Sequence, residues 1–240
     1  MFYQQHPLET IDVNVRGTRN LLETCRTQPV RAMLHLSTSE IYGDPSADAN
    51  PTRESYRGLV SCTGPRACYD ESKRLSETQC AIYHQKHGVP VKVGRPFNMY
   101  GPGQRIDDRR IVPDLMSAAI RNEPIVLLSD GRATRSFCYI RDAVWAMLLI
   151  LLKGQAGEAY NLGNDREEVT MLQVAQLLQE IAGTGKPIEH RVSADPQYLS
   201  DNPQRRCPDL NKLRALADFA PQVLLREGLA RTLQSYRHEV

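Results

Sequence analysis

The sequence predicts an α/β fold in which helices cover a parallel sheet. Two observations support this prediction: short apolar segments alternate with longer segments of helical periodicity, and several of the short segments end in polar side chains. Buried parallel strands are short and apolar on both faces. Ligands of such sheets bind at the carboxyl ends of the strands, so the polar side chains that follow the strands are the first candidates for a functional site.

The N-terminal half alternates helices with strands. Residues 8–28 carry apolar side chains at roughly helical spacing and predict a helix. Residues 30–39 form a short apolar run that ends in hydroxyl residues, which is typical of a buried strand. A second helix is predicted over 66–86, since Gly88 terminates the pattern, and 89–96 is the next strand.

The C-terminal half continues the alternation. Thr170 is predicted to be a helix N-cap, because its hydroxyl can accept from a backbone amide of the first turn. The predicted elements are a loop over 98–110, a helix over 111–122, strands over 124–131 and 134–140, a helix over 141–153, a strand over 158–164, and helices over 170–183, 209–217 and 223–237.

Composition excludes several classes of protein. The net charge of +2 lacks the basic excess of a nucleic-acid-binding chain, and the longest apolar run, 143–152, is too short to cross a bilayer. The N-terminus has no signal-peptide pattern, and six cysteines without a CxxC pair indicate reduced thiols. His84 and His87 have no carboxylate or cysteine cluster beside them, so we expect no metal site. We therefore expect a cytoplasmic protein that binds neither nucleic acid nor membrane.

Tyr69 and Lys73 stand four residues apart in a predicted helix and share one face. This spacing is common, but the strand end at 36–45, LSTSEIYGDP, adds four consecutive hydrogen-bonding side chains. Free tyrosine titrates near pH ~10 and is a poor base at neutral pH. A lysine ammonium and a cationic nicotinamide would lower the pKa of Tyr69, while Thr38 holds the substrate hydroxyl. This arrangement predicts oxidation of an alcohol with hydride transfer to a dinucleotide.

Seven segments together form a more specific pattern. They are NVRGT (14–18), STSEIYGDP (37–45), YDESK (69–73), GRPFNMYGPGQR (94–105), RSFCYIRD (135–142), YNLGN (160–164) and RRCPDLNKL (205–213). In order and spacing, over almost the whole chain, they resemble the extended short-chain dehydrogenase/reductase family. The resemblance is to its nucleotide-sugar decarboxylases, dehydratases and epimerases.

The resemblance implies a Rossmann-like sheet that binds NAD. By it, Tyr69 is the general base, and Lys73 tunes that base and binds the nicotinamide ribose. Thr38 orients the sugar 4-hydroxyl. Ser37 and Pro96 are implied to lie beside the cofactor.

The resemblance also implies which residues hold a UDP-sugar substrate. Asn98 corresponds to a residue that contacts the diphosphate, while Arg135 and Arg206 correspond to arginines on phosphate or sugar groups. The glycines near Arg105 lack the third glycine of a phosphate-binding loop. We therefore expect Arg105 to reach the nucleotide half of the substrate from a loop of the substrate domain.

The triplet Thr38-Ser39-Glu40 separates the subfamilies. Dehydratases resemble T-D-E here, whereas a serine before the glutamate resembles UDP-glucuronate decarboxylases. In that chemistry a 4-ketone turns the C5 carboxylate into a β-keto acid, which loses carbon dioxide with little acid catalysis. Glu40 and Arg135 are implied to steer the carboxylate and the reprotonation.

The family's first strand, glycine-rich turn and helix are absent from this sequence, which aligns with the family's interior. We therefore expect an N-terminally truncated sheet, in which Leu34, Leu36, Val91 and Val93 lack some of their neighbours and invite aggregation or a completing partner. The predicted domains are an NAD-binding part over 1–100 and 134–163, and a smaller nucleotide-sugar-binding part over 101–133 and 164–240.

Three functions follow. The first is NAD-dependent decarboxylation of UDP-glucuronate to UDP-xylose or a UDP-4-keto-pentose. The second is 4-epimerisation or 4,6-dehydration of another nucleotide sugar, and the third is a non-catalytic remnant that binds a nucleotide sugar or a partner chain. The resemblance also implies a homodimer through the helices over 8–28 and 66–86.

Overall fold

The first sheet contains three parallel strands in the order β1-β2-β7. These strands are β1 (Met33–Leu36), β2 (Val91–Pro96) and β7 (Ala159–Leu162). The computed structural model describes residues 2–108, 110–194, 200 and 202–237. All three strands were predicted, because each is a short apolar segment between helical ones. The predicted parallel α/β arrangement is thereby confirmed.

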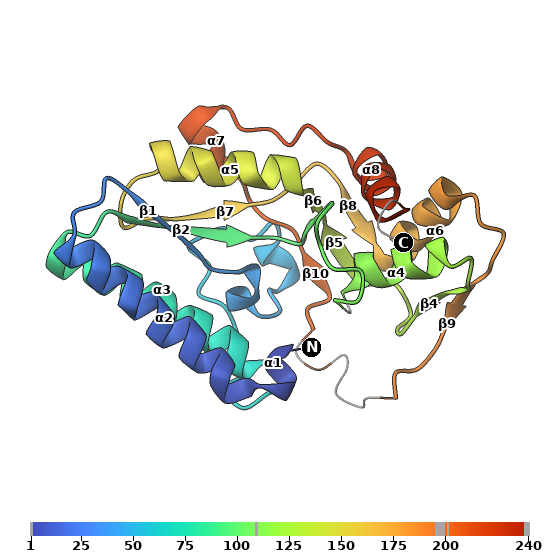
Figure 1. Cartoon of the computed structure of the whole chain (residues 1–240), viewed down its shortest axis with the longest axis horizontal. Coiled ribbons are helices and arrows are strands. Elements are labelled where there is room, and N and C mark those ends of the chain that lie inside the picture. The colour runs from blue at the N-terminus through green and yellow to red at the C-terminus, as the bar shows by residue number, and fades with distance from the viewer. Residues whose placement is uncertain (1, 109, 195–199, 201, 238–240) are drawn as a thin grey trace.

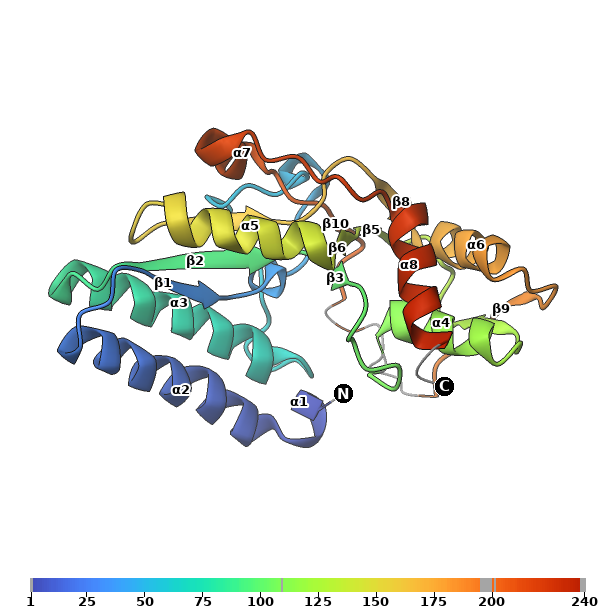
Figure 2. The same ribbon diagram turned by 45° about the horizontal axis from the view of Figure 1, so that its top comes forward.

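Helices lie on both faces of this sheet (Figures 1 and 2). On one face lie α2 (Pro7–Thr27) and α3 (Ala67–His87), and on the other lie α5 (Ile140–Lys153) and α7 (Asn211–Ala217). Leu22 of α2 packs with Val91 of the sheet in one buried cluster, and Leu213 of α7 packs with Leu162 in another. A helix from the predicted substrate domain thus shares the core of the first sheet. The domain division itself stays a prediction.

The sheet has an open edge at β1. In the described part of the chain no strand pairs with that edge. Leu36 is 40% exposed there, as we expected, but Val91 and Val93 are only 1% and 6% exposed. The expectation was wrong for the two valines because α2 and α3 already cover their face of the sheet.

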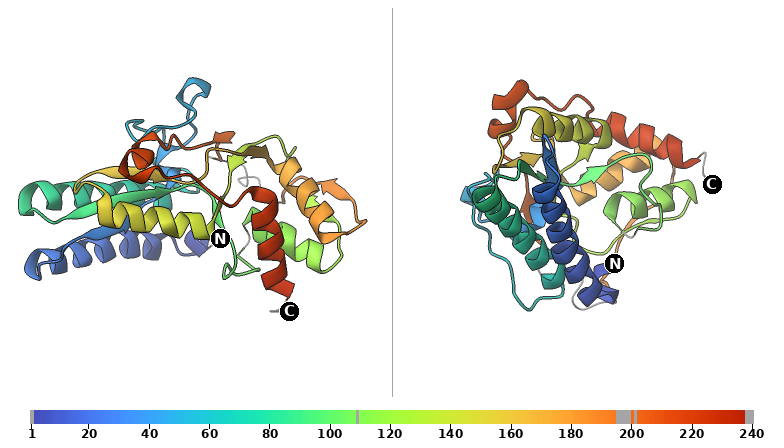
Figure 3. Two further views of the ribbon diagram at one scale, coloured as in Figure 1. Left: turned by 90° about the horizontal axis from the view of Figure 1, so that it is seen from above. Right: turned by 60° about the vertical axis from the view of Figure 1, so that its left-hand side comes forward.

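A second group of elements lies beyond the end of the first sheet (Figure 3). In its three-stranded sheet, β5 (Thr134–Ser136) pairs parallel to β10 (Arg205–Arg206) and antiparallel to β8 (Glu168–Thr170). Two further pairs of parallel strands are β3 (Met99–Tyr100) with β6 (Cys138–Tyr139), and β4 (Ile125–Leu127) with β9 (Ile188–His190). Its helices are α4 (Ile111–Ile120), α6 (Met171–Ala182) and α8 (Leu225–Arg237). One buried cluster joins the three helices through Leu115, Leu178 and Leu229.

Local sequence signals account for several boundaries. Thr170 is the N-cap of α6, as predicted from the sequence, and it also forms a reciprocal capping box with Gln173. The predicted strand over 134–140 is instead broken at Phe137, and its halves, β5 and β6, pair in different sheets. Three short helices were not predicted: α1 (Phe2–Gln5), η1 (Ser39–Tyr42) and η2 (Ala47–Ala49).

Candidate active site

The carboxyl ends of β1 and β2 bring the strand-end residues to one edge of the first sheet. The amide of Ser37 donates to the carbonyl of Gly94 at 2.8 Å, which extends the strand pairing beyond β1. Thr38 is the N-cap of η1, and its hydroxyl accepts from the amide of Glu40 at 3.2 Å. Ser37, Thr38 and Ser39 are all buried, so the backbone of this segment is fixed.

Tyr69 lies in the first turn of α3, beside Thr38. Burial raises the pKa of Tyr69, a hydrogen bond with Thr38 opposes this, and the charge of Glu40 adds to it. Lys73 donates from Nζ to the carbonyl of Leu36 at 3.0 Å, and burial lowers the pKa of Lys73. Burial therefore dominates at Tyr69, and the lysine ammonium is directed to the strand end. The lowering of the Tyr69 pKa that we expected also depends on a cationic nicotinamide, so it stays a prediction.

Tyr3 of α1 stacks on Tyr69. The ring centroids are 5.6 Å apart and the ring planes are inclined by 27°. The guanidinium of Arg66 lies 5.8 Å from the centroid of the Tyr3 ring. Our sequence reasoning missed Tyr3 and Arg66, since neither belongs to a periodic pattern or to a motif that we weighed.

Glu40 lies between two arginines from distant parts of the chain. Arg206 donates from Nη2 to Oε2 of Glu40 at 2.6 Å and from Nη1 to Oε1, in a bidentate pair. Arg66 approaches the same Oε2 from Nη2 at 2.7 Å. Burial alone would raise the pKa of Glu40, but Arg206 and Arg66 outweigh it and lower the pKa to about 2. Glu40 is therefore an ionised carboxylate throughout the neutral range.

Arg135 stands next to Arg206 in the paired strands β5 and β10. It is 7% exposed, and it donates to the carbonyl of Thr134 at 2.7 Å and to Oδ1 of Asn202 at 2.9 Å. Burial and the neighbouring Arg206 lower the pKa of Arg135 to about 10. No described carboxylate forms an ion pair with Arg135; its described hydrogen-bond acceptors are neutral, and the negative charges of Glu40 and Asp44 offset burial only in part.

Of the remaining predicted residues, Asn98 and Pro96 lie at this edge of the sheet and Arg105 does not. Asn98 has a φ of 37°, in the left-handed region, and bridges from the end of β2 to the carbonyl of Ser136 at 3.3 Å. Pro96 ends β2 at the same edge. The side chain of Arg105 is 81% exposed and forms an ion pair with Asp107 at 2.7 Å. Arg105 is therefore not part of the buried group of charged residues around Glu40. Its role in substrate binding stays a prediction.

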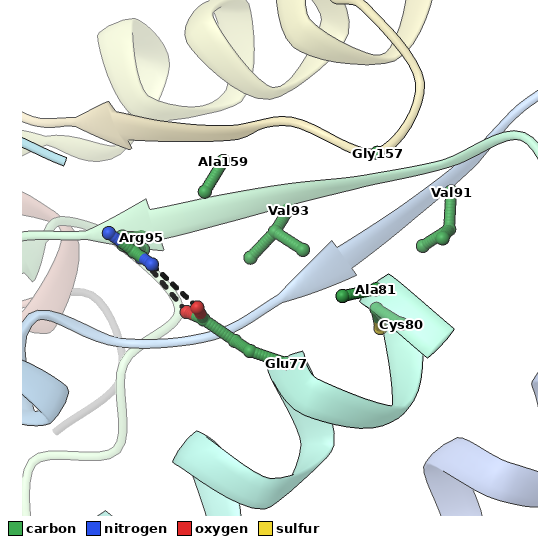
Figure 4. Close-up of a pocket in the computed structure, with 8 residues that line it drawn as sticks. All are labelled: Glu77, Cys80, Ala81, Val91, Val93, Arg95, Gly157 and Ala159. Atoms are coloured by element: carbon green, nitrogen blue, oxygen red, sulfur yellow. Dashed lines mark hydrogen bonds and ion pairs between the residues drawn. The ribbon is translucent and has the colours of Figure 1, made fainter. Parts of the chain in front are cut away.

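A hollow of about 180 Å³ lies on the α3 side of β2 and β7 (Figure 4). Its walls combine apolar side chains with the charged pair Glu77 and Arg95, which point toward each other at one end. Arg95 donates to Glu77 at 2.6 Å, and also to the hydroxyl of Tyr42 and the carbonyl of Glu54, each at 2.8 Å. These contacts join α3 and β2 to Tyr42 of η1, the segment that carries Glu40.

The described residues contain neither a metal-ligand cluster nor a membrane-spanning helix. Within these ranges no group of three or more histidine, cysteine, aspartate or glutamate side chains could hold a metal ion. Among the helices that the structure describes, none is both long and apolar enough to cross a membrane.

The amino-acid sequence is similar to that of a known family and of individual proteins. The model of the NAD dependent epimerase/dehydratase family matches residues 2–163. UDP-glucuronic acid decarboxylase 1 of Arabidopsis thaliana is 37% identical over 99% of this chain and 52% of its own length. UDP-glucuronic acid decarboxylase 6 of the same plant is 38% identical over 99% of this chain and 66% of its own length. The chain thus spans between about half and two thirds of these relatives.

The fold of the chain is similar to that of solved structures. A UDP-glucose 4-epimerase of Thermotoga maritima, solved with UDP-glucose, superposes with a TM-score of 0.88 and 25% identity, covering 99% of this chain and 74% of its own. A UDP-glucuronic acid 4-epimerase of Bacillus cereus, solved with UDP-glucuronic acid and NAD, gives a TM-score of 0.80 and 27% identity over 95% of this chain and 68% of its own.

Proposed function

The chain belongs to the NAD dependent epimerase/dehydratase family, and on this premise we propose that it catalyses the NAD-dependent decarboxylation of UDP-glucuronate. The match supports the family resemblance found in the seven sequence segments. One observation carries the finer proposal: Arg135 is a buried cation with no ion-pair partner among the described residues, and it lies beside Arg206 and Glu40. Such a group suits a substrate that brings its own carboxylate.

The cofactor-side residues fit the nicotinamide ribose. Ser37 Oγ is buried and has no hydrogen-bond partner in the described part of the chain, and it follows the strand whose last carbonyl receives Lys73. We propose that Tyr69, Lys73, Ser37 and Pro96 hold NAD, which when bound accepts a hydride from C4 of the sugar.

The chain's own residues would then act on the substrate in turn. Thr38 orients the 4-hydroxyl, and Tyr69 removes its proton as the C4 carbonyl forms. Arg135 orients the carboxylate on C5, which leaves as carbon dioxide while its bonding electrons pass into the C4 ketone. Since the pKa of Glu40 is lowered to about 2, Glu40 cannot supply the proton that C5 takes up near neutral pH, and we propose that a water molecule supplies it. We assign Glu40 the role of holding Arg206.

A 4-epimerase is the second candidate. It is supported by the Bacillus cereus structure, whose protein is a UDP-glucuronic acid 4-epimerase. An epimerase would use the same Thr38, Tyr69 and Lys73 but would keep the carboxylate. The two functions therefore differ in whether the product has lost carbon dioxide.

The test is to incubate the purified chain with NAD and UDP-glucuronate and to follow the products by mass spectrometry. We expect loss of carbon dioxide and a UDP-pentose or UDP-4-keto-pentose. A product of unchanged mass would favour the epimerase, and no conversion together with UDP binding would favour a non-catalytic remnant.

An Arg135→Ala variant tests the observation behind this proposal. Because a truncated arginine cannot pair with the carboxylate, we expect UDP-glucuronate affinity to fall by roughly 30-fold or more and UDP-glucose affinity by less than about threefold. Equal losses for both sugars in calorimetric titrations would make Arg135 a general phosphate contact.

We also propose that the protein dimerises through α2 and α3. Three apolar side chains of α2 are strongly exposed, namely Leu8 at 75%, Val13 at 72% and Leu21 at 59%, and α3 exposes Leu75 and Ile82 at 48% each. We expect light scattering to give the mass of a dimer for the wild type and of a monomer for Leu21→Glu, since a buried charge opposes association. A monomeric wild type would refute this.

A further inference from the structure

Arg66 joins three parts of the site that the sequence keeps apart. It is the N-cap residue of α3, three positions before Tyr69, and its side chain is 16% exposed. It contacts Glu40 of η1 at 2.7 Å and lies over the ring of Tyr3 at 5.8 Å. One side chain therefore touches the segment after β1, the helix α1, and the start of the helix that carries Tyr69.

We propose that Arg66 is a positioning residue, which holds Glu40 together with Arg206 and holds Tyr3 against Tyr69. The inference rests on the proposed function for its kinetic consequence. Tyr3 stacks on Tyr69 at 5.6 Å, so a shift of the Arg66 guanidinium is passed to the phenol that serves as base. At Glu40, loss of Arg66 leaves Arg206 as the single ion-pair partner among the described residues and frees one side of Oε2.

Electrostatics support this role. Burial lowers the pKa of Arg66, but the negative charge of Glu40, followed by Tyr3 and Asp70, outweighs burial and raises the pKa. Glu40 and Asp70 also raise the pKa of Tyr69, and Arg66 lies against both, with Nε 3.8 Å from Oδ2 of Asp70. Arg110 is the cation that lowers the pKa of Tyr69. Because Arg66 lies against Glu40 and Asp70, we expect its charge to oppose these two as well, and so to increase the ionised fraction of Tyr69.

The kinetic test compares Arg66→Gln with Arg66→Lys. Since small misplacements of catalytic groups cost up to about 100-fold in rate, we expect Arg66→Gln to lower kcat for UDP-glucuronate by roughly 10- to 100-fold, with KM changed by less than about threefold. Arg66→Lys keeps the charge and should recover most of the rate. Arg214→Gln, which removes another ion pair, with Asp165 at 2.6 Å, is the matched control and should leave kcat unchanged.

A second readout does not depend on turnover. The chain is labelled with difluorotyrosine, and the fluorine signal of Tyr69 is assigned by its absence in Tyr69→Phe. We expect Arg66→Gln, but not Arg214→Gln, to change the Tyr69 shift and to raise the midpoint of its titration by about one pH unit. Tyr3→Leu, which removes the stacked ring and keeps all charges, should change the shift and leave the midpoint within about 0.3 units.

The outcomes separate the two proposals. If the wild type releases no carbon dioxide, the proposed function fails, and the fluorine titration alone decides the role of Arg66. An unchanged Tyr69 signal in Arg66→Gln overturns the positioning role. A loss of rate in Arg66→Gln that Arg66→Lys does not recover also overturns it, since this outcome assigns Arg66 a contact specific to the guanidinium.

Discussion

Tyr69→Phe is expected to lower kcat for UDP-glucuronate by about 10²- to 10⁴-fold while leaving the affinity for UDP within about twofold. In the proposed reaction the phenolate of Tyr69 removes the proton from the sugar hydroxyl, and phenylalanine retains the ring that stacks on Tyr3. Packing at the start of α3 is therefore preserved, and the variant loses the hydroxyl with its hydrogen bond to Thr38. Steady-state kinetics and a calorimetric titration with UDP measure the two quantities.

The matched control for this variant is Tyr83→Phe, on the same helix. Tyr83 donates its hydroxyl to Glu23 of α2, at the opposite end of α3 from Tyr69. We expect unchanged turnover in Tyr83→Phe. If Tyr69→Phe also keeps wild-type turnover, Tyr69 has no part in the chemistry and the decarboxylase proposal loses its base.

The pH dependence of the reaction follows from the raised pKa of Tyr69. Because burial raises this pKa, the phenol is the resting form near neutral pH, and the fraction ionised increases as pH rises. The rate of a step that needs the phenolate therefore rises with pH on the acidic side of its optimum. Bound NAD, with its positive nicotinamide, would move this rise to lower pH.

Much of the fold was predictable because its signals are local. Apolar runs of four to six residues identified β1, β2 and β7, and Thr170 identified the start of α6. The short strands β8, β9 and β10 were not predicted, since two or three residues carry no periodicity. They exist because a distant segment offers hydrogen-bond partners, as β5 does for β10.

Some residues of the candidate site were likewise predictable from local sequence signals, and others were not. Tyr69 and Lys73 were found from their spacing on one helix. The contact of Glu40 with Arg206 spans 166 positions, so no local pattern predicts it, and the two residues were suspected separately through the family resemblance. Arg66 and Tyr3 were missed because their roles depend on where α1 lies against α3 in space.

Glu40→Gln is expected to lower the free energy of unfolding by about 3–5 kcal/mol at neutral pH, because it leaves Arg66 and Arg206 buried without their carboxylate. The lowered pKa of Glu40 indicates a stability contribution of similar size. Lowering the pKa of Glu40 from 4.5 to about 2 corresponds to roughly 3 kcal/mol of stability. Since the folded-state pKa is the lower one, this contribution is complete above pH 4.5 and is lost as pH falls from 4.5 toward 2.

Urea unfolding at a series of pH values measures both effects. Wild-type stability should fall through this acidic range, and that of Glu40→Gln should fall less. Glu168→Gln is the matched control: Glu168 forms an equivalent bidentate pair with Arg205, but the side chain of Arg205 is 41% exposed, against 7% for Arg206. Solvent screens that pair, so its loss should cost about 1 kcal/mol or less. Equal losses in the two variants would mean that burial adds nothing to the ion pairs of Glu40, which would then contribute no more than the exposed pair of Glu168 with Arg205.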